Sequence, residues 1–275
     1  SIASYERVRS RILDQSAAEA QTGKSGAREE ARILSSLEGV LATDTDRSLT
    51  SSLEGFFDGF SDLADNPKSG SAREDVLAKS KALTGEFNRL DQKIGEVATN
   101  TASALSESID EANGLIEKVA GLNKTIREAR AGGTPDLAAE DRRDALVKKL
   151  SGFAPVKTQE NADGEYTLSI DGVNVVQGQE TTLLRADNLR QQAEERQQPP
   201  KDVATVEFGN TGVAFQPGDE DAGEIGAQLR ALNQTLPEVQ GRLDDLAEKV
   251  VKQVNSVHTD GTDLNGDTNE PFFFN

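Results

Sequence analysis

Few segments of this chain carry residue types that could bind a ligand, and the first of them is Gly23-Lys24-Ser25. It resembles the end of a phosphate-binding loop, which cradles phosphate with glycine backbone and a lysine. The full motif needs a glycine where Ala18 stands, and it needs a preceding strand, which the sequence does not provide. The glycines at 23 and 26 therefore predict a break or kink in a helix rather than a nucleotide site.

Asp263-Leu264-Asn265-Gly266-Asp267 carries oxygen side chains at alternate positions, like the start of a calcium-binding loop. In such a loop the glycine follows the third ligand, where Thr268 stands here, and a later glutamate completes the site. Turns rich in Asp and Asn also form without metal, because these side chains bond to nearby backbone. We assign no metal to this segment and leave a bound cation open.

His258 is the only histidine, and it stands at the end of a helical pattern, where histidines usually cap carbonyl groups or pack. Asp141-Arg142-Arg143-Asp144 is a charge cluster, which is either a solvated helix face or an Arg–Asp pair that pins the helix to a neighbour. No two carboxylates stand in apolar surroundings that would tune one of them for acid–base work. The sequence therefore predicts no enzyme, no cofactor and no catalytic residue.

The elements that would position these residues are defined by two long ladders of apolar residues. The first ladder comprises Leu83, Phe87, Leu90, Ile94, Val97, Leu105, Ile109, Ile116, Val119 and Ile126. The second comprises Ile225, Leu229, Leu232, Leu236, Val239, Leu243, Leu246, Val250, Val254 and Val257. Steps of three and four residues place each ladder on one stripe of a helix. A lone amphipathic helix is only marginally stable in water, so we expect the two ladders to pair within the chain.

Composition limits the possible partners. Aromatic residues make up 4% of the 275 residues, and Trp and Cys are absent, which favours a thin aliphatic core without disulfides. The net charge of −18 argues against nucleic acid, whose phosphates repel it. No apolar run is long enough to span a membrane. The missing Met at position 1 and the helix-like start predict a fragment of a longer chain.

Helical patterns cover most of the chain. Apolar stripes predict helices around 33–41 and 49–64, the latter ended by Asn66-Pro67, because proline cannot continue a helix. Ser71 and Glu74 form a capping-box pattern that opens a helix reaching Gly132-Gly133. We expect Thr134 to cap the short helix that follows. Pro237 predicts a kink or a helix start inside the second ladder.

The period changes between residues 152 and 222. Short β-rich runs at 156–158, 166–170, 173–176, 182–185 and 203–208 predict strands, and Asp163-Gly164 and Asp171-Gly172 are hairpin signals. The polar segment 187–201 reads as a solvated loop. We therefore expect a mainly helical, elongated antiparallel bundle of long helices, a rod formed by residues 1–151 and 223–275, with a small antiparallel β module inserted at 152–222.

Three groups of residues together resemble one protein family. The first group surrounds Leu49–Pro67 and the Ala-Arg start after it, the second is Asp141–Leu146 with Leu150-Ser151, and the third runs from Leu243 to Phe273. The residues that carry the match are Phe56, Phe57, Leu63, Asn66, Pro67, Arg73, Arg143, Asp144, Leu243, Asp244, Leu246, Asn255, His258, Gly261, Asn265, Gly266 and Phe273. Over about 45–152 and 223–275, the chain resembles the flagellar hook-associated protein 1 (FlgK) family, and the β module matches only by position.

The resemblance implies a structural subunit of the bacterial flagellar axis that forms the junction between hook and filament by self-assembly into a ring. Its partners would be copies of itself, the hook protein, the filament-side junction protein and an export chaperone acting on a C-terminal region outside this chain. The resemblance also implies an extracellular location after type III export without a cleaved signal peptide. The alternative is a coiled-coil adaptor or adhesin stalk that binds another protein through its ladders, which predicts pairing between chains rather than within one.

Overall fold

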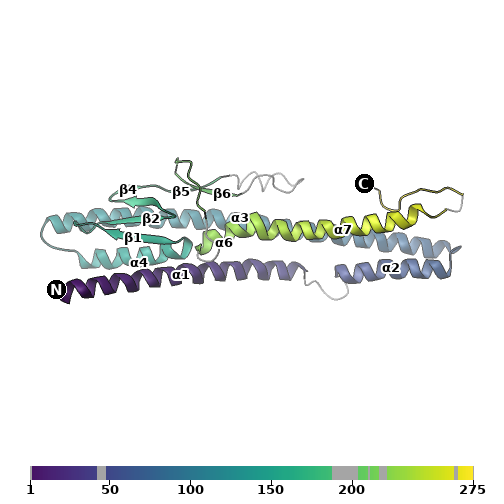
Figure 1. The fold of residues 1–275 in the computed structure, drawn as a ribbon, viewed down its shortest axis with the longest axis horizontal. Helices are drawn as coiled ribbons and strands as arrows, with labels where there is room; N and C mark the ends of the chain where they lie inside the picture. The colour runs from purple at the N-terminus through teal and green to yellow at the C-terminus, as the bar shows by residue number, and fades with distance from the viewer. Residues whose placement is uncertain are drawn as a thin grey trace. The chain divides into compact units, whose positions relative to one another are not determined.

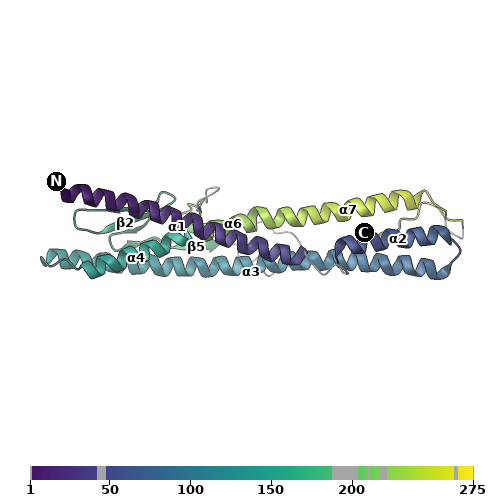
Figure 2. The same cartoon turned by 90° about the horizontal axis from the view of Figure 1, so that it is seen from below.

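The computed structural model describes residues 2–41, 48–187, 204–209, 211–216, 222–262 and 266–274, and it is dominated by helices (Figures 1 and 2). The side chains of residues 2–12 and 187 are not described. The helices are α1 (Ile2–Leu41), α2 (Leu49–Asp65), α3 (Gly70–Ala131), α4 (Leu137–Phe153), α6 (Gly223–Arg230), the π-helix η2 (Ala231–Thr235) and α7 (Leu236–Thr259). The strands are β1 (Val156–Glu160), β2 (Tyr166–Ile170), β3 (Val173–Gln177), β4 (Glu180–Thr181), β5 (Leu184–Asp187) and β6 (Thr205–Phe208). The expected class, mainly helical with a small inserted antiparallel sheet, is confirmed.

Compactness divides the chain into two units, and long helices pass from one to the other. Unit 1 contains Ser1–Ser36 and Val97–Thr235, and unit 2 contains Leu37–Glu96 and Leu236–Asn275. All described strands therefore lie in unit 1, together with most of α1, the second part of α3, α4, α6 and η2. Unit 2 is formed by α2, the first part of α3, α7 and the segment after α7.

The core of unit 1 lies between the helices and a four-stranded antiparallel sheet in the order β1-β2-β3-β4, which is drawn beside α3 and α4 in Figure 1. The inward side chains of this sheet are fully shielded, and they are Leu168, Ile170, Val175 and Val176, all 0% exposed. Strands β5 and β6 form a separate antiparallel pair. Burying this alternating apolar face against helices is what stabilises such a small sheet.

The two Asp-Gly signals both mark hairpins, but their loops differ. Asp171 and Gly172 are the only residues between β2 and β3, and both have positive φ, 49° and 78°, as a type I′ turn requires. The β1–β2 loop is longer, because Asn161 accepts the N–H groups of Asp163 and Glu165 on its side-chain oxygen, at 3.0 and 2.9 Å. The Asp163-Gly164 signal therefore marks a hairpin as predicted, but the hairpin has a five-residue loop instead of the two-residue turn for which Asp-Gly is the strongest signal.

The predicted helix break at Gly23 and Gly26 is also wrong, because α1 continues through both glycines. A Cβ atom on Gly26 would lie 3.2 Å from the carbonyl oxygen of Gly223, and one on Gly152 would lie 3.2 Å from the Ser25 hydroxyl. Thr22 donates to the carbonyl oxygen of Ser151 at 2.6 Å. The small residues of the apparent phosphate-loop motif therefore allow α1 to approach the backbone of α4 and α6 closely.

Two predicted helix caps are each displaced by two residues. The N–H of Ala72 donates to the hydroxyl of Ser69 at 3.2 Å, so Ser69 rather than Ser71 caps the start of α3. The N–H of Ala139 donates to the carboxylate of Asp136 at 3.0 Å, so Asp136 rather than Thr134 caps α4. In both cases the capping side chain stands three residues before the backbone N–H that donates to it.

The ladders are buried to different extents. Nine of the ten first-ladder residues are buried along α3, the exception being the half-buried Phe87. The second ladder is interrupted by η2 immediately before Pro237, which confirms the predicted irregularity, since proline cannot donate to a carbonyl four residues earlier. Towards its end the second ladder is open to solvent, with Leu246 37% and Val257 71% exposed. No helix in the described ranges is long and apolar enough to cross a membrane.

Candidate functional site

Four asparagine side chains on helices hold extended backbone in the same way. In each case the amide nitrogen donates to the carbonyl oxygen of one residue, and the amide oxygen accepts that residue's own N–H. The pairs are Asn113 with Leu184, Asn123 with Tyr166, Asn233 with Ala204 and Asn255 with Phe273, at distances of 2.8–3.0 Å. Each amide thus replaces a neighbouring strand, satisfying backbone groups that would be costly to bury unpaired. We call these the asparagine clamps.

The clamps fix the β module and the last segment to specific positions on the helices. Asn113 and Asn123 are on α3 and hold β5 and β2, whereas Asn233 is on η2 and holds the residue before β6. Of these asparagines, the sequence signatures included only Asn255. A signal existed for Asn123, which stands between Val119 and Ile126 in the first ladder, where an apolar residue was expected.

Arg143 is the centre of the polar contacts between α4 and the sheet, although its side chain is only 2% exposed. Its Nη1 donates to the carbonyl oxygen of Gly164 at 2.6 Å and to the Asn123 amide oxygen at 3.3 Å. Its guanidinium carbon lies 3.4 Å from the ring centroid of Tyr166, a cation–π contact. The predicted charge cluster is therefore split: Arg142 is exposed, whereas Arg143 pins α4 to the sheet.

The environment of Arg143 also perturbs two neighbouring acids. Burial is the main cause that raises the pKa of Tyr166 to about 12, and the negative charge of Asp144 adds to it. The Asp144 side chain is 55% exposed, and its partial burial raises its pKa, against a hydrogen bond from Tyr166 and the charge of Arg143. The phenol therefore stays neutral at physiological pH and serves as a hydrogen-bond donor and as the face for the cation.

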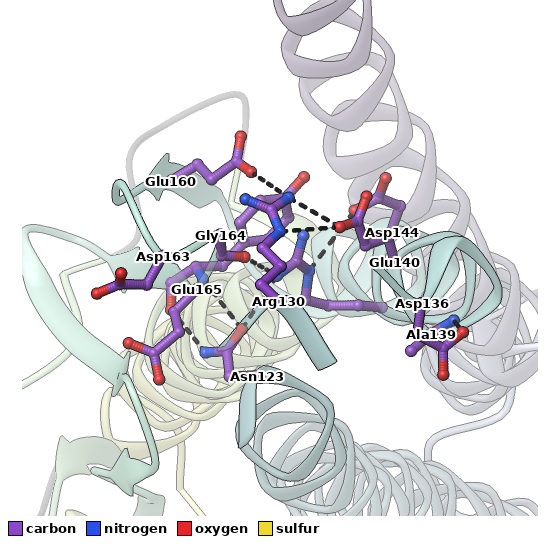
Figure 3. A network of polar contacts seen from close by, with 12 residues as sticks. Asn123, Arg130, Asp136, Ala139, Glu140, Asp144, Glu160, Asp163, Gly164 and Glu165 are labelled. Atoms are coloured by element: carbon purple, nitrogen blue, oxygen red, sulfur yellow. Dashed lines mark hydrogen bonds and ion pairs between the residues drawn. The ribbon is translucent and has the colours of Figure 1, made fainter. Parts of the chain in front are cut away.

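A second arginine, Arg130, connects three elements in the same region (Figure 3). Arg130, near the end of α3, donates to Glu140 of α4 at 2.8 Å and to Glu160 of β1 at 3.2 Å. Gly164 has φ +81°, and a Cβ atom there would lie 2.1 Å from the guanidinium carbon of Arg130. The positive φ is therefore the main reason why the β1–β2 loop favours glycine at this point, and a Cβ atom there would also displace the Arg130 guanidinium.

Residues of the first and third signature groups come together in unit 2 as a phenylalanine cluster of Phe56, Phe60, Phe272 and Phe273. The ring of Phe56 is 0% exposed and lies 6.0 Å from that of Phe272 and 5.8 Å from that of Phe273. His258 belongs to the edge of this cluster: its Nδ1 lies 2.7 Å from the carbonyl oxygen of Glu270, and its ring packs edge-on against Phe272. These are packing and backbone contacts, as predicted for this histidine.

The other signature residues lie at turns or on the surface. Asn66 ends α2, with its N–H 3.2 Å from the carbonyl oxygen of Asp62, and Arg73 donates to the carbonyl oxygen of Pro67. Gly261 donates to the carbonyl oxygen of His258 at 3.1 Å, and Gly266 has φ +93°. Phe57, Asp144, Asp244 and Leu246 are exposed, Leu63 is half-buried and Leu243 is buried. The signature residues therefore form separate clusters rather than one site.

Two sequence candidates lie in or beside parts that the structure does not describe. Asp263, Leu264 and Asn265 fall outside the described residues, as does most of the predicted polar loop at 187–201. Among the residues that are described, no group of three or more His, Asp or Glu side chains is arranged to hold a metal ion.

A groove of about 280 Å³ lies in unit 1 between α1 and the α6–η2 segment. Its floor is formed by Ile33, Ala227 and Ala231, and its rim carries Glu30 and Arg230, 4.0 Å apart. This lining combines small apolar side chains with one ion pair. Leu34, Gln234 and Thr235 complete the lining, and no histidine is part of it, so the groove has the character of a packing groove.

Comparison with known proteins places these features in one family. The family model described as the flagellar hook-associated protein FlgK helical domain matches residues 34–273, which includes the β module. The chain is 27% identical to flagellar hook-associated protein 1 of Bacillus subtilis (strain 168) over 98% of this chain and 57% of that protein. It is also 27% identical to the protein of that name from Escherichia coli (strain K12), over 92% of this chain and 46% of the relative.

The fold agrees with a solved structure. The flagellar hook junction protein FlgK from Burkholderia pseudomallei superposes with a TM-score of 0.75 at 21% identity, over 94% of this chain and 46% of that chain. The present chain thus spans about half the length of the relatives it matches. The β module, which resembled the family only by position, is part of the matched region. Because the family model matches residues 34–273, the chain belongs to the FlgK hook-associated protein family and corresponds to its helical domain.

Proposed function

We propose that this chain is part of a structural subunit of the bacterial flagellar axis, at the junction between hook and filament. The observation that carries the proposal is the family match over residues 34–273. The relatives it matches are named as flagellar hook-associated proteins, and the similar structure is named as a hook junction protein. The proposal includes self-assembly into a ring, with the hook protein and the filament-side junction protein as neighbours.

The physical character of the chain supports a load-bearing role. Long helices carry an aliphatic core, and the asparagine clamps and Arg143 attach the β module at several points rather than through one linker. Such multiple attachment keeps an inserted module from moving independently under load. We propose no catalytic activity, because the buried polar side chains described above bond to backbone instead of facing a substrate cavity.

We further propose that the parent protein is exported through the flagellar type III apparatus without a cleaved signal peptide, assisted by a chaperone, and acts outside the cell. The absence of Cys is compatible with that route. The net charge of −18 on these 275 residues disfavours nucleic acid as a partner.

The test is a chimera of flagellar hook-associated protein 1 from Bacillus subtilis in which the matched region is replaced by residues 1–275. The chimera is expressed in a strain lacking its own copy of that protein. The proposal expects motility and filaments attached to hooks. Secretion of the chimera without attached filaments would contradict the junction role, and a chimera with the destabilising Gly223→Ala change serves as a control for folding.

The alternative function is a coiled-coil adaptor or adhesin stalk. The exposure of Leu246 and Val257 favours it, since a free apolar stripe can pair with another chain. Multi-angle light scattering on the 275-residue chain separates the two functions. A monomer supports ladders that pair within the chain, whereas a stable dimer or trimer that Leu246→Ser with Val257→Ser dissociates supports the adaptor.

A further inference from the structure

A second polar network, separate from the arginine-centred contacts, is enclosed between α1, α3 and α6 in unit 1. The amide nitrogen of Gln228 donates to Glu29 at 3.0 Å and to the hydroxyl of Ser108 at 3.2 Å. Ser108 in turn donates to Glu224 at 3.4 Å. Gln228, Ser108 and Glu29 are only 1%, 4% and 7% exposed. Two carboxylates from different helices are therefore connected through one buried amide and one buried hydroxyl.

This network is one hydrogen-bond donor short. One amide hydrogen of Gln228 goes to Glu29 and the other to the Ser108 oxygen, whose own hydrogen goes to Glu224, and the buried amide oxygen of Gln228 has no partner. An unpaired buried oxygen destabilises the folded state. A proton bound by a carboxylate would add one donor to the group. Ser108 can accept it, because its oxygen has two lone pairs and receives only one bond from Gln228.

The two carboxylates differ in their neighbours. Glu29 makes two bonds of 2.7 Å to Arg32, one turn along α1, and these bonds and that of Gln228 lower its pKa against the opposing effect of burial. Glu224 has no such arginine contact. Burial is the main cause that raises the pKa of Glu224, and the charges of Glu29 on α1 and Glu111 on α3 raise it further. The hydrogen bond from Ser108 and the charge of Arg32 oppose this shift.

The remaining element packed on α6 contributes backbone. Phe153 and Ala154, at the end of α4, meet α6 at Gly223, where a Cβ atom would lie 2.5 Å from the carbonyl oxygen of Phe153. Arg32 is the cation that affects both acids, but its hydrogen bonds go to Glu29. A proton entering the network therefore goes to Glu224.

We propose that Glu224 and Glu29 form a proton-operated latch that holds α1 against α3 and α6 most tightly when Glu224 is protonated and Glu29 is ionised. Protonation of Glu224 removes the repulsion between the two carboxylates and adds to the network a donor that the Ser108 oxygen can accept. Protonation of Glu29 has the opposite effect, because it breaks the bonds to Arg32 and Gln228. The latch concerns the pH response of unit 1 and does not depend on the proposed role in the flagellum.

The direction of each effect follows from linkage. The pKa of Glu224 is raised in the folded state, so its contribution to stability grows as the pH falls through that pKa and is lost as the pH rises through it. The pKa of Glu29 is lowered, so its contribution is present above its unfolded value and is lost as the pH falls through the folded pKa. The attachment of α1 therefore has a maximum on the acidic side of neutral, between the two folded pKa values.

Two measurements on the 275-residue chain test the latch. Native-state hydrogen exchange of the α1 amides, corrected for intrinsic rates, gives the opening of α1 from about pH 8 to about pH 4. We expect opening to slow by about threefold or more as the pH falls through the raised pKa of Glu224, and to accelerate again as it falls through the lowered pKa of Glu29. Carbon-13 NMR of the Glu224 carboxyl group in the wild-type chain gives its titration directly, without any substitution.

The variants separate the two carboxylates. Glu224→Gln should slow opening at neutral pH and remove the pH dependence on the alkaline side of the maximum, whereas Glu29→Gln should accelerate opening at neutral pH. Glu117→Gln, an exposed change on α3, is the matched control and should leave the profile unchanged. A Glu224 carboxyl group that titrates at or below its ordinary value, or a Glu224→Gln variant with the wild-type profile, would overturn the proposal.

Discussion

The guanidinium of Arg143 donates to the carbonyl oxygen of Gly164 at 2.6 Å. This buried cation on α4 is therefore stabilised mainly by the neutral oxygens of Gly164 and Asn123 rather than by a close carboxylate. The nearest acidic partner, Asp144, is 3.9 Å away from Nε. This relationship links the helices to the β module through one side chain, and the Nε atom has no hydrogen-bond partner. It makes unit 1 sensitive to changes at a few buried polar positions.

Arg143→Ala should lower the free energy of unfolding by about 3 kcal/mol, because it leaves the Gly164 carbonyl and Asn123 amide with unmade bonds. Chemical denaturation followed by circular dichroism measures this change. Arg142→Ala is the matched control, since Arg142 is exposed beside it, and its effect should stay within about 0.5 kcal/mol. Equal effects of the two substitutions would contradict the assigned role of Arg143.

Asn123→Ala should lower the free energy of unfolding by about 2–4 kcal/mol, because the Asn123 amide makes four hydrogen bonds with three partner residues in a fully buried position. Its loss leaves the N–H and C=O groups of Tyr166 unpaired. Hydrogen exchange at the Tyr166 amide should accelerate more than exchange at Leu184, which Asn113 holds independently. A uniform acceleration at both amides would argue against separate clamps.

Tyr166 gives unit 1 an alkaline limit. Its pKa is raised to about 12 in the folded chain, so the neutral phenol stabilises the fold below the unfolded value of about 10, and that stability is lost as the pH rises towards 12. Denaturation at pH values between about 9 and 12 should show a steeper loss of stability for wild type than for Tyr166→Phe. A parallel loss in both proteins would assign the alkaline transition to other groups.

Gly223→Ala should destabilise unit 1 by about 2–4 kcal/mol. The backbone there has φ +67°, and a Cβ atom would lie 2.5 Å from the Phe153 carbonyl oxygen. Gly121→Ala is the opposite case, because it lies inside α3 with open space around it, and it should stabilise the helix by about 0.5–1 kcal/mol. Thermal unfolding of the two variants checks both signs.

Asn255→Ala should release the segment that carries Phe272 and Phe273, because the Asn255 amide provides three hydrogen bonds to their backbone. Limited proteolysis should then cut before the phenylalanines faster than in wild type, while the helices of unit 2 remain folded. Ser256→Ala, at the next and exposed position, is the control. Unchanged proteolysis in the Asn255 variant would mean that ring packing alone holds the segment.

The sequence by itself determined the helices and most of the strands, because these depend on spacing within a few residues. The first ladder predicted the body of α3, and the Ser71–Glu74 pattern and Gly132-Gly133 predicted its ends within one or two residues. Asn66-Pro67 marked the end of α2, and Asp171-Gly172 marked a two-residue turn. The motifs of the resemblance likewise depended on local order and spacing, which is why they indicated the family before any fold was known.

Tertiary structure alone decided what the isolated polar residues and glycines do. Gly23 and Gly26 predicted a break, because glycine weakens a helix locally. In the folded chain the backbone of Gly223, more than a hundred residues away, approaches Gly26 where a side chain would otherwise stand. Arg142 and Arg143 are equivalent in sequence, and only the partners of Arg143 on other elements make it the buried one. Hydrogen-bond partners far apart in the chain leave no periodic trace. Apart from the polar residue Asn123 within the first ladder, the clamps and the network around Gln228 therefore became visible only in the folded chain.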